Sequence, residues 1–168
     1  MRGQDIYLPG PLPSNERSRR TVDRQSNRLT RTVRLAPGAA AVLNELRRRR
    51  LPIGIASNAQ AYTHVELADA LAPVGIGLDL FDPGLTFWSF EHGFSKPDPH
   101  VFRILTARLA GRGIRPPEAL MVGDRQDNDI DPARRAGWDA WHLDPADPGP
   151  CWDRLQAHLL ASTRSLHP

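Results

Sequence analysis

The sequence has a single cysteine, a single lysine, few aromatic residues and no long apolar run. Cys151 stands alone among 168 residues, which excludes a disulfide framework and a cysteine-based metal cluster. A membrane-spanning helix needs at least about 18 consecutive apolar residues, and no run of that length occurs. The first residues also lack the apolar segment of a signal peptide. We therefore expect a protein of the cytoplasm that does not enter a membrane.

The scarcity of lysine draws attention to the one that is present. Lys96 is the only lysine among the 22 Lys and Arg residues, and it lies in Ser95-Lys96-Pro97-Asp98-Pro99. A lysine ammonium is a compact point charge, whereas the guanidinium of arginine is planar and suits different partners. Because the chain uses arginine everywhere else, the sequence indicates a functional role for Lys96.

Positive charge is concentrated in the first part of the chain. Residues 1–36 hold eight arginines against Asp5, Glu16 and Asp23, a net +5, so the remainder carries −2 of the total +3. Residues 1–34 are rich in Pro and Arg and show no helical or strand periodicity, so we predict an irregular segment. A basic tail can bind nucleic acid, but this one lacks interleaved aromatic residues. We therefore expect no nucleic-acid partner and keep a basic-tail nucleic-acid binder as a further alternative.

Residues 35–168 alternate short apolar runs with helical patterns. We expect strands at residues 51–56, 85–90, 119–122 and 139–143, and helices at residues 37–50, 61–71, 99–110, 132–136 and from Trp152 onward. Asp98 and Asp131 each precede a proline, which predicts an N-cap followed by the first helical residue. The alternation of strands and helices is typical of an α/β domain with a mostly parallel sheet.

Polar side chains follow the ends of the predicted strands. Ser57 and Asn58 come directly after the first strand, Lys96 lies in the loop after the second, and Asp124 follows the third after Gly123. Ligands of parallel sheets bind beyond the carboxyl ends of the strands, so these side chains can converge there. A hydroxyl, an ammonium and carboxylates such as Asp124 and Asp129 are the groups that hold a phosphoryl group beside Mg²⁺. We expect Asp124 to be buried at its strand end.

The acidic cluster also allows two other interpretations. Asp127, Asp129 and Asp131 begin like a calcium-binding EF-hand loop, but Pro132 and Trp138 then replace the required Gly and Glu. Helix capping explains Asp131, because Pro132 follows it directly. For Asp127, capping and a functional role remain equally open.

Taken together, these motifs resemble the haloacid dehalogenase (HAD) superfamily of hydrolases, which are mostly magnesium-dependent phosphatases. The resemblance covers roughly residues 35–145 and rests on IGIASN at residues 53–58, KPDP at residues 96–99 and VGDRQDND at residues 122–129. It implies a Rossmann-like fold, a small phosphorylated substrate and Mg²⁺ as cofactor. It further implies that Ser57 and Asn58 bind the substrate, that Lys96 stabilises charge during catalysis, and that Asp124 and Asp129 ligate the metal.

One motif of that family is absent from the sequence. The family's first strand ends in Asp-x-Asp-x-Thr, whose first Asp attacks phosphorus, and neither Asp5 nor Asp23 lies in such a context. The nucleophile is therefore unknown. This strand is central in the family, so its two neighbours would expose unpaired backbone groups. Residues 31–35 are a poor replacement for this central strand, because their alternating arginines suit a strand at the exposed edge of a sheet.

The resemblance also implies that a cap domain is missing, because the spacing from Asn58 to Lys96 leaves no room for a large insertion there. Three hypotheses follow for the missing strand and cap. The chain is a truncated or misread phosphatase, or a partner chain or self-association completes the sheet, or the chain is a pseudoenzyme that binds a phosphoryl ligand or a protein without catalysis. A dehalogenase needs no metal, so the acidic cluster argues against that activity.

Overall fold

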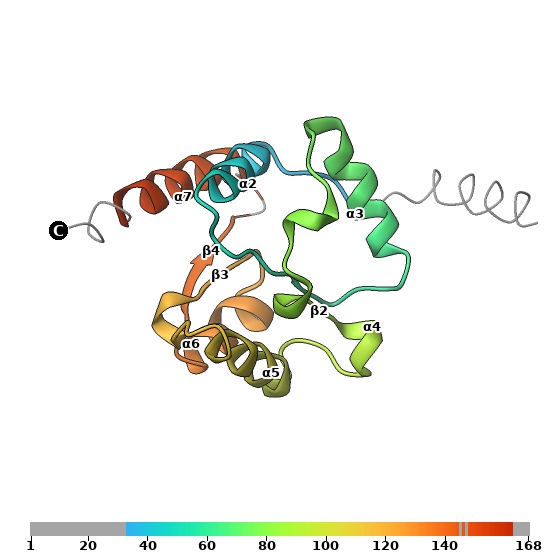
Figure 1. Cartoon of the computed structure of the whole chain (residues 1–168), viewed down its shortest axis with the longest axis vertical. Coiled ribbons are helices and arrows are strands. Elements are labelled where there is room, and N and C mark those ends of the chain that lie inside the picture. The colour runs from blue at the N-terminus through green and yellow to red at the C-terminus, as the bar shows by residue number, and fades with distance from the viewer. Residues whose placement is uncertain (1–32, 145, 147, 163–168) are drawn as a thin grey trace, which may run out of the picture. The chain divides into compact units, whose positions relative to one another are not determined.

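The computed structural model describes residues 33–144, 146 and 148–162. The helices among them are α2 (Ala39–Arg48), α3 (Thr63–Leu71), α4 (Ser89–His92), α5 (Pro99–Ala110), α6 (Asp131–Arg135) and α7 (Pro148–Ser162). The strands are β1 (Ala56–Ser57), β2 (Phe87–Trp88), β3 (Leu120–Gly123) and β4 (Asp139–His142). Helices α2 and α7 lie together on one side of β3 and β4, and α5 and α6 lie on the other (Figure 1). The predicted α/β class with flanking helices is confirmed.

The strands form two separate parallel pairs. β1 pairs with β2, with Ala56 opposite Phe87, and β3 pairs with β4, with Met121 opposite Ala140. Among the described residues no strand joins β1 to β3. The structure thus has the interrupted sheet that the absence of a central first strand predicts.

Several element boundaries differ from the sequence-based prediction. The expected strand at residues 51–56 is assigned only at Ala56–Ser57, and the expected strand at residues 85–90 only at Phe87–Trp88. Leu85 instead ends a 3-10 turn over Pro83–Leu85, which offers β1 no continuous ladder. Helix α2 begins at Ala39, because Gly38 takes a left-handed backbone with φ +87° that ends the preceding turn.

The region after β3 also departs from the prediction. Asp131 is the first residue of α6 and not its N-cap, which is Ile130, because a π-helical turn over Gln126–Ile130 leads directly into the helix.

The basic segment 1–34 lies almost wholly outside the described residues, so its predicted irregularity stays a prediction. Residues 33–35 form no strand.

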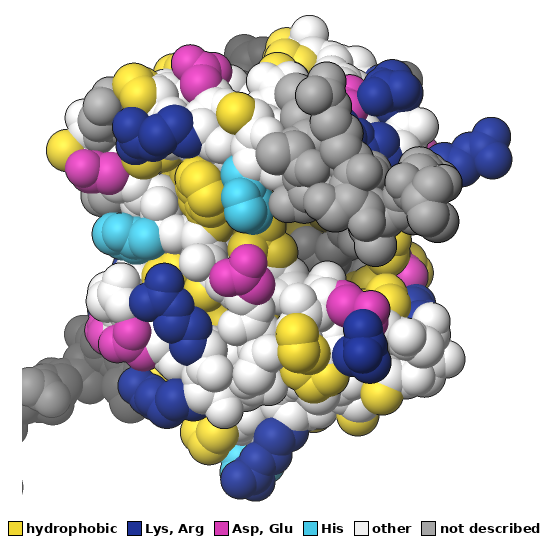
Figure 2. Space-filling model, turned by 90° about the vertical axis from the view of Figure 1, so that its left-hand side faces the viewer, with side chains coloured by type: hydrophobic (Ala, Val, Ile, Leu, Met, Phe, Trp, Pro, Cys, Tyr) yellow, Lys and Arg dark blue, Asp and Glu magenta, His cyan; other side chains and the backbone are white. Residues whose placement is uncertain are grey.

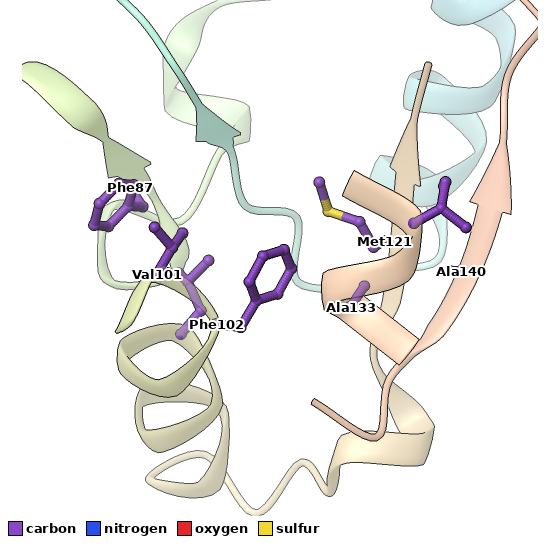
Figure 3. Packing of buried hydrophobic residues seen from close by; sticks show 8 residues of the cluster. Phe87, Val101, Phe102, Met121, Ala133 and Ala140 are labelled. Carbon is purple, nitrogen blue, oxygen red and sulfur yellow. The ribbon is translucent and has the colours of Figure 1, made fainter. Parts of the chain in front are cut away.

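One hydrophobic core serves both strand pairs. Phe87 of β2, Val101 and Phe102 of α5, and Met121 of β3 belong to a single buried cluster with residues of α6 and β4. Figure 3 shows Phe102 pointing from α5 into the space between Phe87 and Met121. Asp98 caps α5 by accepting the His100 N–H at 2.8 Å, as its position before Pro99 predicts. Through Val101 and Phe102, helix α5 therefore packs against residues of both strand pairs.

The described surface mixes charges of both signs. On the face shown in Figure 2, the acidic and basic side chains that are coloured are interspersed and do not separate into patches of one sign.

Within the described part of the chain, no helix combines the length and apolar character needed to cross a membrane.

Replacing Phe102 by Ala should destabilise the fold by about 3–5 kcal/mol, because it opens a cavity between the two strand pairs. Phe102 is only 2% exposed. Urea unfolding of Phe102→Ala measures the loss, and Arg103→Ala, on the exposed face of α5, is the control and should change stability by under about 0.5 kcal/mol. Equal effects of the two substitutions would contradict a shared core at this helix.

Candidate active site

Three loops bring the predicted site residues to the carboxyl ends of β1 and β3. Ser57 closes β1 and Asn58 follows it, Lys96 lies between α4 and α5, and Asp129 lies in the turn after β3. Hydrogen bonds and an ion pair link Asn58, Lys96 and Asp129 directly. The strand-end argument predicted that Ser57, Lys96 and Asp124 converge, whereas the observed contacts join Lys96 to Asn58 and Asp129.

Asn58 holds the backbone of the lysine loop. Its side-chain Nδ2 donates to the Lys96 carbonyl at 2.8 Å, and its Oδ1 accepts the Lys96 N–H at 2.8 Å. Both hydrogen-bonding ends of the amide are thus used on one peptide unit, which fixes where the lysine side chain starts. This geometry shows a positioning role for Asn58, which the sequence motif did not reveal.

The loop after β1 is also fixed by the first residue of α4. The Ser89 hydroxyl donates to the Ala59 carbonyl at 3.1 Å and accepts the Ala59 N–H at 2.9 Å. No sequence motif singled out Ser89, because the predicted strand at residues 85–90 included it, whereas β2 ends at Trp88. Ser57 is half-buried, and its hydroxyl makes no side-chain hydrogen bond within the described residues.

Lys96 and Asp129 form a largely buried ion pair. The Lys96 ammonium contacts Asp129 Oδ1, and the two side chains are 10% and 6% exposed. The second carboxylate oxygen, Oδ2, accepts the Arg125 N–H at 3.1 Å. A buried carboxylate must be paired and hydrogen-bonded, and both conditions are met here.

Gly123 allows Asp129 to lie over the end of β3. A Cβ atom at this position would lie 2.5 Å from the Asp129 side chain, closer than real contacts permit. Glycine at position 123 is therefore a steric requirement of the buried carboxylate six residues later in the chain.

The expectation that Asp124 is buried is wrong. Asp124 is exposed, because the chain leaves the sheet directly after Gly123. Its carbonyl accepts a hydrogen bond from His142 Nε2 at 3.0 Å, while its carboxylate makes no hydrogen bond to any described residue. An exposed, unengaged carboxylate remains available to a ligand from solution.

The other two carboxylates of the cluster are engaged. The Arg125 guanidinium contacts both oxygens of Asp127, at 3.2 and 2.8 Å, and this hydrogen bonding lowers the pKa of Asp127. Asp131 accepts from the Gln126 side chain. These contacts favour a structural role for Asp127. Both oxygens of Asp129 are engaged as well, so the metal-ligand roles predicted for Asp124 and Asp129 stay predictions, and Asp124 is the one whose carboxylate makes no hydrogen bond to a described residue.

The described residues contain no cluster of three His, Cys, Asp or Glu that could hold a metal ion by itself. Mg²⁺, however, commonly uses only one or two protein carboxylates and takes its other ligands from water and substrate oxygens. The unengaged carboxylate of Asp124 fits that requirement and does not fit a closed structural metal site.

Removing the lysine should cost more than removing the whole ion pair. Lys96→Met leaves Asp129 buried without its cation and should lower stability by about 3–5 kcal/mol. The double variant Lys96→Met with Asp129→Asn should recover much of that loss, because no unpaired charge remains. Urea unfolding of the two single variants and the double variant measures the coupling, and additive effects would contradict a buried pair.

The family comparison covers most of the chain. Residues 16–137 match the model of the haloacid dehalogenase-like hydrolase family. A phosphoserine phosphatase of Thermus thermophilus is 38% identical over 118 residues, which are 68% of this chain and 44% of the relative. A glyceraldehyde 3-phosphate phosphatase of Methanopyrus kandleri is 49% identical over 49 residues, 29% of this chain and 20% of the relative. The chain thus spans less than half the length of these curated relatives.

Solved structures agree with this assignment. A HAD phosphatase from Thermococcus onnurineus superposes with a TM-score of 0.54 at 28% identity, over 66% of this chain and 46% of that one. The HAD-hydrolase YfnB from Bacillus subtilis shares the fold, with a TM-score of 0.52 at 24% identity over 64% and 43% of the two chains. With its lysine, its strand-end polar residues and its acidic motif in the family's order, the chain belongs to the haloacid dehalogenase-like hydrolases.

Proposed function

We propose that this chain carries the phosphoryl- and magnesium-binding part of a phosphomonoesterase site and does not hydrolyse phosphomonoesters alone. The observation that carries the proposal is the buried Lys96–Asp129 ion pair, held by Asn58 at the strand ends. Lysine, carboxylates and a free hydroxyl at one strand-end edge are the groups that bind a phosphoryl ester beside a hard cation.

Each residue has a distinct role in this proposal. Asp124 would hold Mg²⁺, because its carboxylate is exposed and makes no hydrogen bond to a described residue. The buried carboxylate of Asp129 adds negative charge and holds the Lys96 side chain in place through their ion pair. Ser57 donates its hydroxyl to a phosphoryl oxygen. Bound Mg²⁺ would neutralise negative charge on the phosphoryl oxygens, and the Lys96 ammonium adds a second positive charge.

The inactivity of the isolated chain follows from its residues. A phosphatase of this kind needs a carboxylate nucleophile at the end of a central strand. The sequence has no Asp-x-Asp-x-Thr motif, and the described residues include no strand between β1 and β3. Both curated relatives are named as phosphatases of phosphomonoesters, which supports a small phosphorylated compound as the ligand class. A cytoplasmic location is part of the same proposal.

A second candidate is a pseudoenzyme that only binds a phosphorylated ligand or a protein. The observation that favours it is the same combination of intact binding groups and a missing nucleophile. The two candidates differ in whether adding a nucleophile-bearing strand restores hydrolysis.

Calorimetric titration tests the binding part of the proposal. The chain should bind Mg²⁺, and bound Mg²⁺ should strengthen the binding of inorganic phosphate. Asp124→Asn keeps the shape but removes the charge, so it should weaken Mg²⁺ binding by about tenfold or more. Asp127→Asn is the matched control and should change it little, because Asp127 is engaged by Arg125.

The proposal fails if neither ion binds, or if Asp127→Asn weakens Mg²⁺ binding as much as Asp124→Asn. The same titration with Lys96→Met is not informative on its own, because that variant is expected to be destabilised.

A further inference from the structure

The run of arginines at residues 47–50 is divided between two environments. Arg48 and Arg49 pair with Glu45, at 2.7 and 2.6 Å. Arg47 and Arg50 instead line an open pocket of about 390 Å³. The other lining residues are Leu51, Gly75, Gly77, Asp79 and Leu80. The pocket therefore lies between the end of α2 and the turns that follow α3.

Arg50 holds a backbone conformation that favours glycine. Its φ is +57°, and no other non-glycine residue among those described has a positive φ. This left-handed residue ends α2, and the Leu51 N–H then donates back to the Leu46 carbonyl at 3.1 Å. A glycine would take the same conformation at a lower cost. The arginine at this position is therefore better explained by its side chain than by the backbone.

The charged side chains of the pocket are available to a ligand. Neither Arg50 nor Asp79 makes a side-chain hydrogen bond or ion pair to a described residue. The Arg47 guanidinium donates to Asn44 Oδ1 at 2.7 Å and to the Gly75 carbonyl at 3.4 Å. These two bonds hold Arg47 in place and leave other N–H groups of its guanidinium unused. The pocket thus presents two guanidinium groups and one carboxylate.

Glycine at position 77 makes room for that carboxylate. Any residue can adopt the φ of −103° found at Gly77, so the backbone does not require glycine there. A Cβ atom on Gly77 would, however, collide with the Asp79 carboxylate. The absence of a side chain at Gly77 therefore allows Asp79 to hold its carboxylate at the wall of the pocket.

We propose that this pocket binds a small phosphomonoester that also carries an ammonium group. Two guanidinium groups match the oxygen geometry of a phosphate and its charge of about −1.5 to −2. The Asp79 carboxylate repels a phosphate and accepts hydrogen bonds from an ammonium. A phosphate without an ammonium would leave Asp79 unpaired beside negative charge. A volume of about 390 Å³ is within the range of small-molecule sites.

The pocket is separate from the candidate active site. Arg50 and Leu51 lie before the segment that leads into β1, whereas Ser57 and Asn58 lie at the carboxyl end of that strand. The residues that line the pocket include none of those at the candidate active site. The inference therefore does not depend on the proposed function.

Titration of the full chain with phosphoethanolamine, followed by amide NMR, tests this inference. EDTA is present, so that metal ions contribute nothing to the binding. The ligand should shift the amide signals of Arg50, Gly75 and Gly77, and it should bind more tightly than inorganic phosphate or ethanolamine. Absence of these shifts would overturn the proposal, and so would shifts confined to Asn58 and Lys96, which would place the ligand at the candidate active site.

Two variants test the roles of the charged groups. Arg50→Gly suits the φ of this position, so it should unfold at the same or a higher urea concentration than the unchanged chain. It should nevertheless bind phosphoethanolamine about tenfold or more weakly. Asp79→Asn should remove the preference for phosphoethanolamine over inorganic phosphate.

Arg48→Ala is the matched control from the same arginine run. Arg48 is paired with Glu45 and does not line the pocket, so its loss should change the affinity by less than about twofold. Equal weakening by Arg48→Ala and Arg50→Gly would overturn the proposal, because it would show attraction by the general positive charge of the helix end. A preference that persists in Asp79→Asn would overturn the ammonium assignment.

Discussion

The arrangement of this molecule depends on the buried ion pair between Lys96 and Asp129. Backbone hydrogen bonds hold β1 to β2 and β3 to β4, but among the described residues none joins the two pairs. Besides the shared core around Phe102, the link between them is Lys96, which Asn58 holds at the end of β1 and which contacts Asp129 over the end of β3. Burying two charges is costly unless each is paired and hydrogen-bonded, so the pair fixes the distance between the two strand ends closely.

That constraint also sets the chemistry of the site. The buried pair places a positive charge at the strand ends while nearly cancelling it with Asp129, which leaves Asp124 as the free anionic group. Arg125 is engaged with Asp127, so it does not neutralise Asp124 by a direct contact. A phosphorylated ligand alone would meet the negative carboxylate of Asp124. With a divalent cation on Asp124, the same ligand would meet the positive charge of the metal instead.

Much of this was predictable from the sequence, and the failures have physical reasons. Asp98 before Pro99 and the spacing of Phe102, Leu105 and Leu109 predicted α5 well, because a capped helix with one apolar face is determined locally. The strands were predicted too long, because strand length depends on a partner that lies far away in the sequence, and the partner of β1 turns away at residues 83–85.

The site shows the same division between local and non-local information. The rule that parallel strands present their carboxyl ends together predicted convergence of Ser57, Lys96 and Asp124. The contacts instead join Lys96 to Asn58 and Asp129. The exposure of Asp124 and the positioning role of Asn58 did not follow, because both depend on how the loops leave the sheet. The interrupted sheet was predicted from one absent motif, since a central strand has no substitute in a chain whose only upstream candidate alternates arginines.

The central claim is that the chain holds the binding groups of a phosphatase site without its nucleophile. Spectrophotometric turnover of p-nitrophenyl phosphate in the presence of Mg²⁺ tests this claim most directly. The account predicts no turnover above the uncatalysed rate for the chain alone. Mg²⁺-dependent turnover that disappears in Asp124→Asn would contradict it, because it would require a nucleophile within these residues.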